Sequence, residues 1–118
     1  YADWLSLRSG HHYRLPSRAE WELVARAGPP DPNRNCKFGF SGLSRGRETV
    51  AVTSGVQNER GVVNLFGNVR EWTMDGDVPV AMGGSYTDPI SACDINSAHS
   101  GSNDGNISTG LRLVREVP

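Results

Sequence analysis

The two cysteines and three histidines are the side chains of this 118-residue sequence best suited to catalysis or metal binding. Cys36 and Cys93 are too few for a disulfide scaffold and show no C-x-x-C spacing for zinc. One disulfide or two free thiols both stay open, because the cellular compartment decides between them. His11 and His12 are adjacent, and neighbouring side chains on a strand point to opposite faces. We therefore interpret the pair as partly exposed residues beside a strand, not as ligands of one metal ion.

Residues 86–109 form a polar segment in which 15 of 24 residues are Ser, Thr, Asn, Asp or Gly. The segment contains no Lys, Arg, Glu, Gln, Met or Trp, although Lys and Glu are among the commonest residues in proteins. One interpretation is a surface loop rich in Gly, Ser and Asn that has no binding role. The other is a binding face, whose small polar side chains adapt to a ligand as antibody loops do. Ser97, His99 and Asp104 have the residue types of a catalytic triad, but no nucleophile elbow or rigid frame accompanies them.

Two helices are expected in the first 28 residues. Ser17 followed by Glu20 is a capping box that predicts a helix start. Three apolar side chains then follow at helical spacing: Trp21, Val24 and Ala25. The helix is expected to end at Gly28, ahead of two prolines. Residues 1–7 predict an earlier helix that stops at Gly10.

The rest of the chain predicts short strands joined by long loops. The apolar runs concerned are residues 50–52, the end of an apolar turn at 64–72, residues 78–82 and residues 110–115. In the last run, Leu111 and Leu113 are expected on one face. Trp21, Phe66 and Trp72 are the large side chains expected to anchor a loop-rich core. The pattern predicts an α+β fold of two helices beside short twisted strands.

Four sequence motifs in a fixed order carry a family resemblance. They are Y-R-L-P-S-R-A-E-W at 13–21 with A-R-A-G at 25–28, N-L-F-G-N-V-R-E-W at 64–72, G-G-S-Y at 83–86 and G-L-R-L at 110–113. Together they resemble the formylglycine-generating enzyme (sulfatase-modifying factor) superfamily, whose pattern includes G-N-V-x-E-W and R-G-G-S-W. The resemblance implies a C-type lectin-like fold. We expect residues 1–118 to form one domain, the C-terminal part of a longer protein.

The resemblance also implies a metal site that this sequence does not complete. The formylglycine-generating enzyme binds copper through two cysteines spaced C-x4-C just after the G-G-S-W motif. Cys93 stands at the second of these positions, but Asp88 stands at the first. Cu(I) selects soft thiolates, and a hard carboxylate does not replace one. We therefore expect no catalytic residue, no metal and no cofactor, and favour a binding domain over an enzyme.

Residues 86–109 resemble, in composition and position, the variable segment of diversity-generating retroelement variable proteins. Those retroelements randomise adenines in Asn codons, which never yields Lys, Glu, Gln, Met or Trp. This resemblance implies a ligand-binding surface for a protein or other macromolecule, with exposed polar side chains. The candidate ligand-binding residues are Tyr86, Thr87, Asp88, Ser91, Asp94, Asn96, Ser97, His99, Ser100, Ser102, Asn103, Asp104, Asn106 and Ser108.

Charge and hydropathy exclude two other classes of partner. The net charge is -1, and the eleven arginines and the single lysine, Lys37, form no basic stripe, which disfavours nucleic-acid binding. Mean hydropathy is -0.46 and no apolar run approaches 18 residues, so no membrane span is expected. Two alternatives remain open: a fragment of a formylglycine-generating-type oxidase or non-haem iron sulfoxide synthase, and an accessory domain of a signalling protein.

Overall fold

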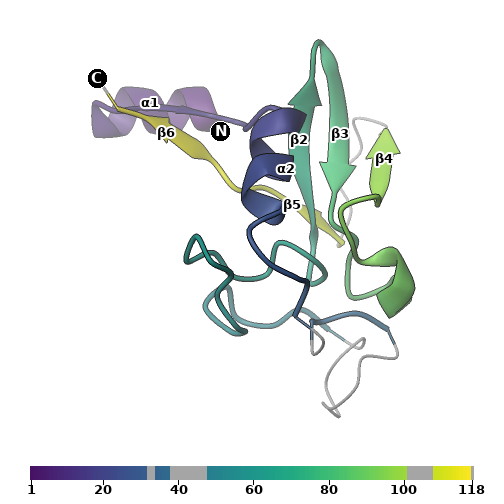
Figure 1. Cartoon of the computed structure of the whole chain (residues 1–118). Helices are drawn as coiled ribbons and strands as arrows, with labels where there is room; N and C mark the ends of the chain where they lie inside the picture. Colours follow the sequence, from purple (N-terminus) through teal and green to yellow (C-terminus); the bar gives the residue numbers. More distant parts are fainter. Residues whose placement is uncertain (32–33, 38–47, 101–107, 118) are drawn as a thin grey trace.

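The computed structural model of the chain describes residues 1–31, 34–37, 48–100 and 108–117. The elements in these ranges are α1 (Ala2–Ser9), β1 (His12–Arg14), α2 (Arg18–Ala25), β2 (Arg70–Asp75), β3 (Val78–Met82), the 3-10 helix η1 (Ile90–Ala92), β4 (Ala98–Ser100), β5 (Thr109–Gly110) and β6 (Val114–Glu116). Helix α2 packs on β2, and β1 contacts both α1 and β6, on the side of the molecule opposite β4 (Figure 1). The predicted α+β class is confirmed. In the described ranges, no helix is long and apolar enough to cross a bilayer.

A four-stranded sheet with the order β4-β3-β2-β5 forms the centre of the fold, and β1 pairs with β6 separately. Strands β2 and β3 form an antiparallel hairpin, and β5 runs parallel to β2. The prediction of a single strand at 110–115 is wrong. Two strands share this stretch, because Gly110 ends β5 and Val114 begins β6. Residues 111–113 between them pair with no strand, and the Arg112 side chain there donates to Glu71.

Both predicted helices are present. The Ser17 Oγ accepts a hydrogen bond from the backbone N–H of Glu20 at 3.1 Å, and the Glu20 carboxylate accepts from the N–H of Ser17 at 2.8 Å. This reciprocal pair is the predicted capping box at the start of α2. Helix α1 ends at Gly10, which adopts the left-handed conformation with φ 75°. Helix α2 ends at Ala25, three residues before the predicted stop at Gly28. Local sequence signals therefore set the end of α1 and the start of α2, but not the end of α2.

The apolar core lies between α2, β3 and the turn before β2. Its buried members are Trp21, Ala25, Leu65, Phe66, Val80 and Met82. The rings of Trp21 and Phe66 meet edge to face, with centroids 5.9 Å apart. Trp72 is only half-buried and is not part of this cluster, so its expected role as a core anchor is wrong. Strand alternation turns Glu71 and Thr73 inward instead.

The polar side chain of Glu71 on the inner face of β2 is accommodated in the core by hydrogen bonds. The Trp21 Nε1 donates to Glu71 Oε2 at 2.8 Å, and Arg112 Nη2 donates to Glu71 Oε1 at 2.9 Å. Arg112 Nη2 also donates to the carbonyl oxygen of Val63 at 2.8 Å. Burial raises the pKa of Glu71, and the bonds from Arg112 and Trp21 oppose that rise. The network joins three of the four sequence motifs through their side chains.

The predicted strand at 50–52 is wrong within the described residues, where this stretch pairs with no strand. The side chain of Asn68 takes the place of a neighbouring strand. Its Oδ1 accepts from the N–H of Val50 at 2.9 Å, and its Nδ2 donates to the carbonyl oxygen of Val50 at 3.3 Å. A side-chain amide offers the same donor and acceptor as a backbone peptide group, so the stretch is held without forming a sheet.

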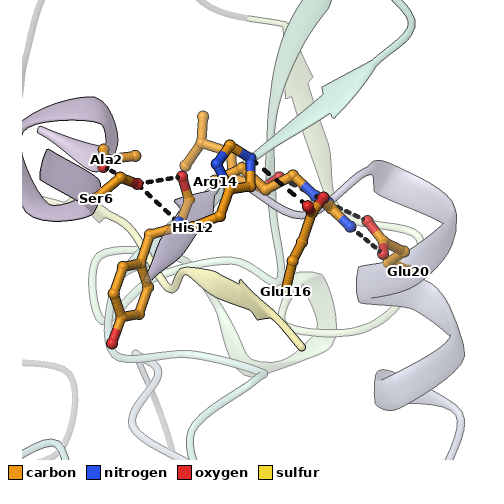
Figure 2. A network of polar contacts seen from close by, with 8 residues as sticks. Ala2, Ser6, His12, Arg14, Glu20 and Glu116 are labelled. Atoms are coloured by element: carbon orange, nitrogen blue, oxygen red, sulfur yellow. Dashed lines mark hydrogen bonds and ion pairs between the residues drawn. The ribbon is translucent and has the colours of Figure 1, made fainter. Parts of the chain in front are cut away.

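A polar network around Arg14 ties the first helices to the end of the chain. Figure 2 shows the Arg14 guanidinium between Glu20 at the start of α2 and Glu116 on β6, at 2.7 Å from an oxygen of each. Ser6 on α1 accepts from the N–H of Tyr13 at 2.8 Å. These contacts hold β1, α1 and β6 to α2. None of these residues belongs to the segment 86–109, and their contacts serve the scaffold.

Candidate ligand-binding surface

The chain that follows β3 runs against a buried disulfide. Gly84 has φ 74°, and a Cβ there would lie 2.9 Å from both the carbonyl oxygen of Ala92 and the Sγ of Cys93. At Gly67, with φ 81°, a Cβ would lie 2.6 Å from the Sγ of Cys36. Only glycine combines these backbone angles with so close an approach. The glycines of two sequence motifs thus pack on the two sulfurs of one bridge.

Cys36 and Cys93 form that disulfide, 57 residues apart in sequence and fully buried. Of the two states that the sequence leaves open, the structure contains the disulfide. Arg34 reinforces it: its Nε donates to the carbonyl oxygen of Cys93 at 2.7 Å and its Nη2 to that of Ile90 at 2.8 Å. Desolvation lowers the pKa of Arg34. Residues 90–93 are therefore fixed to the 34–37 stretch by a covalent bond and a shared guanidinium.

Asp88 is held in place by the scaffold. Its carboxylate accepts from the Nη2 of Arg70 at 2.8 and 3.0 Å, and from the backbone N–H of Ser85 at 2.8 Å. Ser108, at the other end of the segment, is also buried. The expectation of exposed polar side chains is therefore wrong for Asp88 and Ser108, because contacts made by Arg70 draw both inward. No signal in the isolated sequence identified Arg70 as their partner.

Other candidate residues do face solvent. Five of them have exposed side chains and form what we call the displayed surface: Thr87, Ser91, Asn96, His99 and Ser100. Tyr86, Asp94 and Ser97 are half-buried. The candidates Ser102, Asn103, Asp104 and Asn106 lie outside the described residues. The displayed surface spans η1 and β4, on the side of the molecule away from α1 (Figure 1).

The displayed surface has a β-strand beneath it that the sequence did not predict. Strand β4 pairs antiparallel with β3, from Val80↔Ser100 to Met82↔Ala98. All three β4 residues are exposed, so no buried side chain supplies the hydrophobic alternation by which strands are recognised. The backbone of His99 is thus fixed by the sheet, while its side chain faces solvent.

The two positions that would hold copper do not fit Cu(I). Asp88 and Cys93 both contact the backbone of Ser85. The N–H of Ser85 donates to the Asp88 carboxylate, and its carbonyl oxygen lies 3.5 Å from the Sγ of Cys93. The Asp88 carboxylate is a hard ligand already paired with a guanidinium, and the Cys93 sulfur is bonded to Cys36. A soft cation needs thiolates. In the described part of the chain, no three His, Cys, Asp or Glu side chains are grouped to hold a metal ion.

Comparison with known proteins establishes the family. The model of the sulfatase-modifying factor enzyme 1-like domain matches residues 1–117. The chain belongs to this family. The match covers the Trp21–Glu71–Arg112 network and the G-G-S motif, and so confirms the resemblance carried by the four motifs. No curated protein matches the chain.

Solved structures with the same fold include three of interest. The structure of PvdO from Pseudomonas aeruginosa aligns with a TM-score of 0.72 and 23% identity, over 99% of this chain and 57% of that one. Treponema denticola variable protein 1 aligns with a TM-score of 0.72 and 23% identity, over 87% and 47%. CarF aligns with a TM-score of 0.68 and 27% identity, over 90% and 48%. The chain spans about half the length of these proteins, and the likeness concerns the fold.

Proposed function

We propose that this chain is a non-catalytic ligand-binding domain that presents residues 86–109 to a protein or other macromolecule. One observation carries the proposal: the polar side chains of the displayed surface face solvent, while the backbone beneath them is fixed by a disulfide, an ion pair and a sheet edge. A binding face of this kind gains affinity because its backbone is already ordered before the ligand arrives.

The same segment is where we propose sequence variation of the retroelement type. The fold is shared with a protein named as a variable protein, at 23% identity. Scaffold residues flank the segment on both sides. The buried residues Met82 and Ser85 precede it, and Gly110 on β5 and Arg112, the partner of Glu71, follow it. A fixed frame of this kind tolerates exposed residues of many types, since surface substitutions usually change stability by no more than about 0.5 kcal/mol.

Sequencing tests the variability. The coding region is amplified from many independent clonal populations of the source organism and read deeply. We expect substitutions concentrated in codons 86–109, at positions where a neighbouring template copy carries adenine. Substitutions spread evenly over the chain, or the absence of any template copy, would argue against the retroelement origin and leave a conventional binding domain.

A binding assay tests the ligand-binding role with a matched control. The displayed variant carries Ser91→Ala, Asn96→Ala, His99→Ala and Ser100→Ala, and the control carries Asp3→Ala, Leu7→Ala and Leu23→Ala on α1 and α2. All seven side chains are exposed. Partners captured reversibly by the wild type should be retained by the control and lost by the displayed variant. Loss in the control alone would place the binding face on the helices.

A copper titration separates this proposal from an oxidase fragment. The oxidised wild type should not bind Cu(I) tightly against a competing chelator, because neither position of the pair offers a free thiolate. Stoichiometric binding that disappears in Cys93→Ala would overturn the non-catalytic assignment.

A further inference from the structure

Arg70 contacts both ends of the polar segment. Its Nη2 donates to the two carboxylate oxygens of Asp88 at 2.8 and 3.0 Å. Its Nη1 donates to the Oγ of Ser108 at 3.3 Å, and its backbone N–H donates to the carbonyl oxygen of Ser108 at 2.8 Å. Asp88 and Ser108 are 20 positions apart in the chain. A single residue of β2 therefore holds two residues that lie near opposite ends of the polar segment.

The backbone of Arg70 belongs to a strand that is paired on both sides. Arg70 is the first residue of β2, which pairs with β3 over five residue pairs and with β5 at Arg70↔Thr109. The side chains of Arg70 and Asp88 are each 17% exposed, so solvent and salt screen their attraction less than at an exposed pair. A guanidinium is planar and presents its donors in a fixed fork, which sets the orientation of its partners.

Arg70 and Asp88 both occupy informative positions of the family pattern. Arg70 occupies the open position of G-N-V-x-E-W, and Asp88 occupies the first position of the cysteine pair. Asp88 meets Ser85, which also contacts Cys93. An ion pair and a disulfide thus occupy the two positions at which the family pattern has its cysteine pair.

We propose that Arg70 is a positioning residue for ligand binding, which holds Asp88 and Ser108 to strand β2 so that the displayed surface is presented in one conformation. This inference rests on the proposed function. Arg70 itself, half-buried beneath the segment, makes no contact with the ligand in this scheme. Its loss loosens the segment while the apolar core, which it does not join, stays packed.

Amide hydrogen exchange tests this positioning role without any ligand. In Arg70→Gln, amides of residues 86–100 should exchange at least about tenfold faster, while those of 72–74 and 80–82 stay within about twofold of the wild type. The matched control is Arg112→Gln, which removes the ion pair of Arg112 with the buried carboxylate of Glu71 in the core network. We expect the control to speed exchange in both regions together. Equal acceleration everywhere in Arg70→Gln, or none at 86–100, would overturn the proposal.

Two further variants keep the test decisive if Arg70→Gln does not fold. Arg70→Lys keeps the charge but loses the fork, and Asp88→Asn keeps the shape but loses the charge; each should loosen 86–100 by a smaller factor. A nanobody raised against the wild type, and shown to need His99, then reports presentation: its Kd should weaken in Arg70→Lys and in Asp88→Asn, and not in Arg26→Lys, whose ion pair with Glu22 lies at the end of α2. Unchanged exchange and an unchanged Kd in both variants would refute the positioning role, whereas a failed search for natural partners bears only on the proposed function.

Discussion

Two neighbouring residues of β2 serve opposite regions of the molecule. Glu71 points into the core, where it accepts from Trp21 and Arg112, and Arg70 points toward the polar segment, where it holds Asp88. Each region thus centres on one arginine–carboxylate pair, and strand alternation separates the two pairs. In the core pair the carboxylate is 5% exposed and the guanidinium 39%, whereas both members of the segment pair are 17% exposed. The difference shows how one strand builds a scaffold on one face and positions a surface from the other.

The largest effect on stability is expected from a substitution in the apolar core. Trp21→Ala should lower the free energy of unfolding by about 3–5 kcal/mol, because it leaves a cavity and takes away the hydrogen bond to Glu71. Urea denaturation measures this. Trp4→Ala, on exposed α1, is the control and should cost no more than about 0.5 kcal/mol. Similar losses in the two variants would mean that α2 does not anchor the core.

The disulfide should come next, because it joins the polar segment to the scaffold. A bridge between residues 57 apart stabilises by about 4 kcal/mol in the chain-entropy model. Melting of the wild type with and without a reducing dithiol measures its effect, and the double variant Cys36→Ser/Cys93→Ser should match the reduced protein and no longer respond to reductant. A thermal midpoint that ignores the dithiol would show that the bridge is absent in solution.

A smaller effect is expected at the start of α2. Ser17→Ala deletes the cap acceptor for the N–H of Glu20 and should cost roughly 0.5–2 kcal/mol. The control is Ser91→Ala on the displayed surface, which should leave the midpoint of denaturation unchanged. Equal stability of the two variants would contradict the capping box as a stabilising feature of the scaffold.

Acid should weaken the scaffold through Glu20. The hydrogen bond from Arg14, followed by that from Ser17, lowers the pKa of Glu20 from 4.5 to about 2. Between these values the unfolded chain binds more protons, so the free energy of unfolding should fall as pH drops from 4.5 toward 2. The side chain is 43% exposed, and screening keeps the effect small. Glu20→Gln should flatten this part of the profile; an unaltered profile would assign the acid sensitivity to other carboxylates.

The smallest effect is expected on the displayed surface. Ser91→Ala, Asn96→Ala, His99→Ala and Ser100→Ala should each change the free energy of unfolding by no more than about 0.5 kcal/mol. Their combined melt beside that of Trp21→Ala sharpens the contrast between the two regions. A collapse of the combined variant as severe as that of Trp21→Ala would mean that these residues support the fold, and the comparison would fail.

Features that depend on neighbours in the chain were predictable. The capping box at Ser17, the stop at Gly10 and strand β3 follow from local signals, and the motifs led to the family before any contact was known. The predicted strand at 50–52 failed because a side chain, that of Asn68, replaced its neighbour. Strand β4 escaped prediction because none of its residues is buried.

The sequence by itself determined the family, the two helices, the position of the polar segment and the replacement of one thiolate by Asp88. Only the tertiary structure decided that Cys36 pairs with Cys93, that Arg70 joins Asp88 to Ser108, and that Trp72 stays half outside the core. The physical reason is range. Caps and turns are bonds between residues a few positions apart, whereas these contacts join residues 18 to 57 positions apart and exist only once the sheet has brought them together.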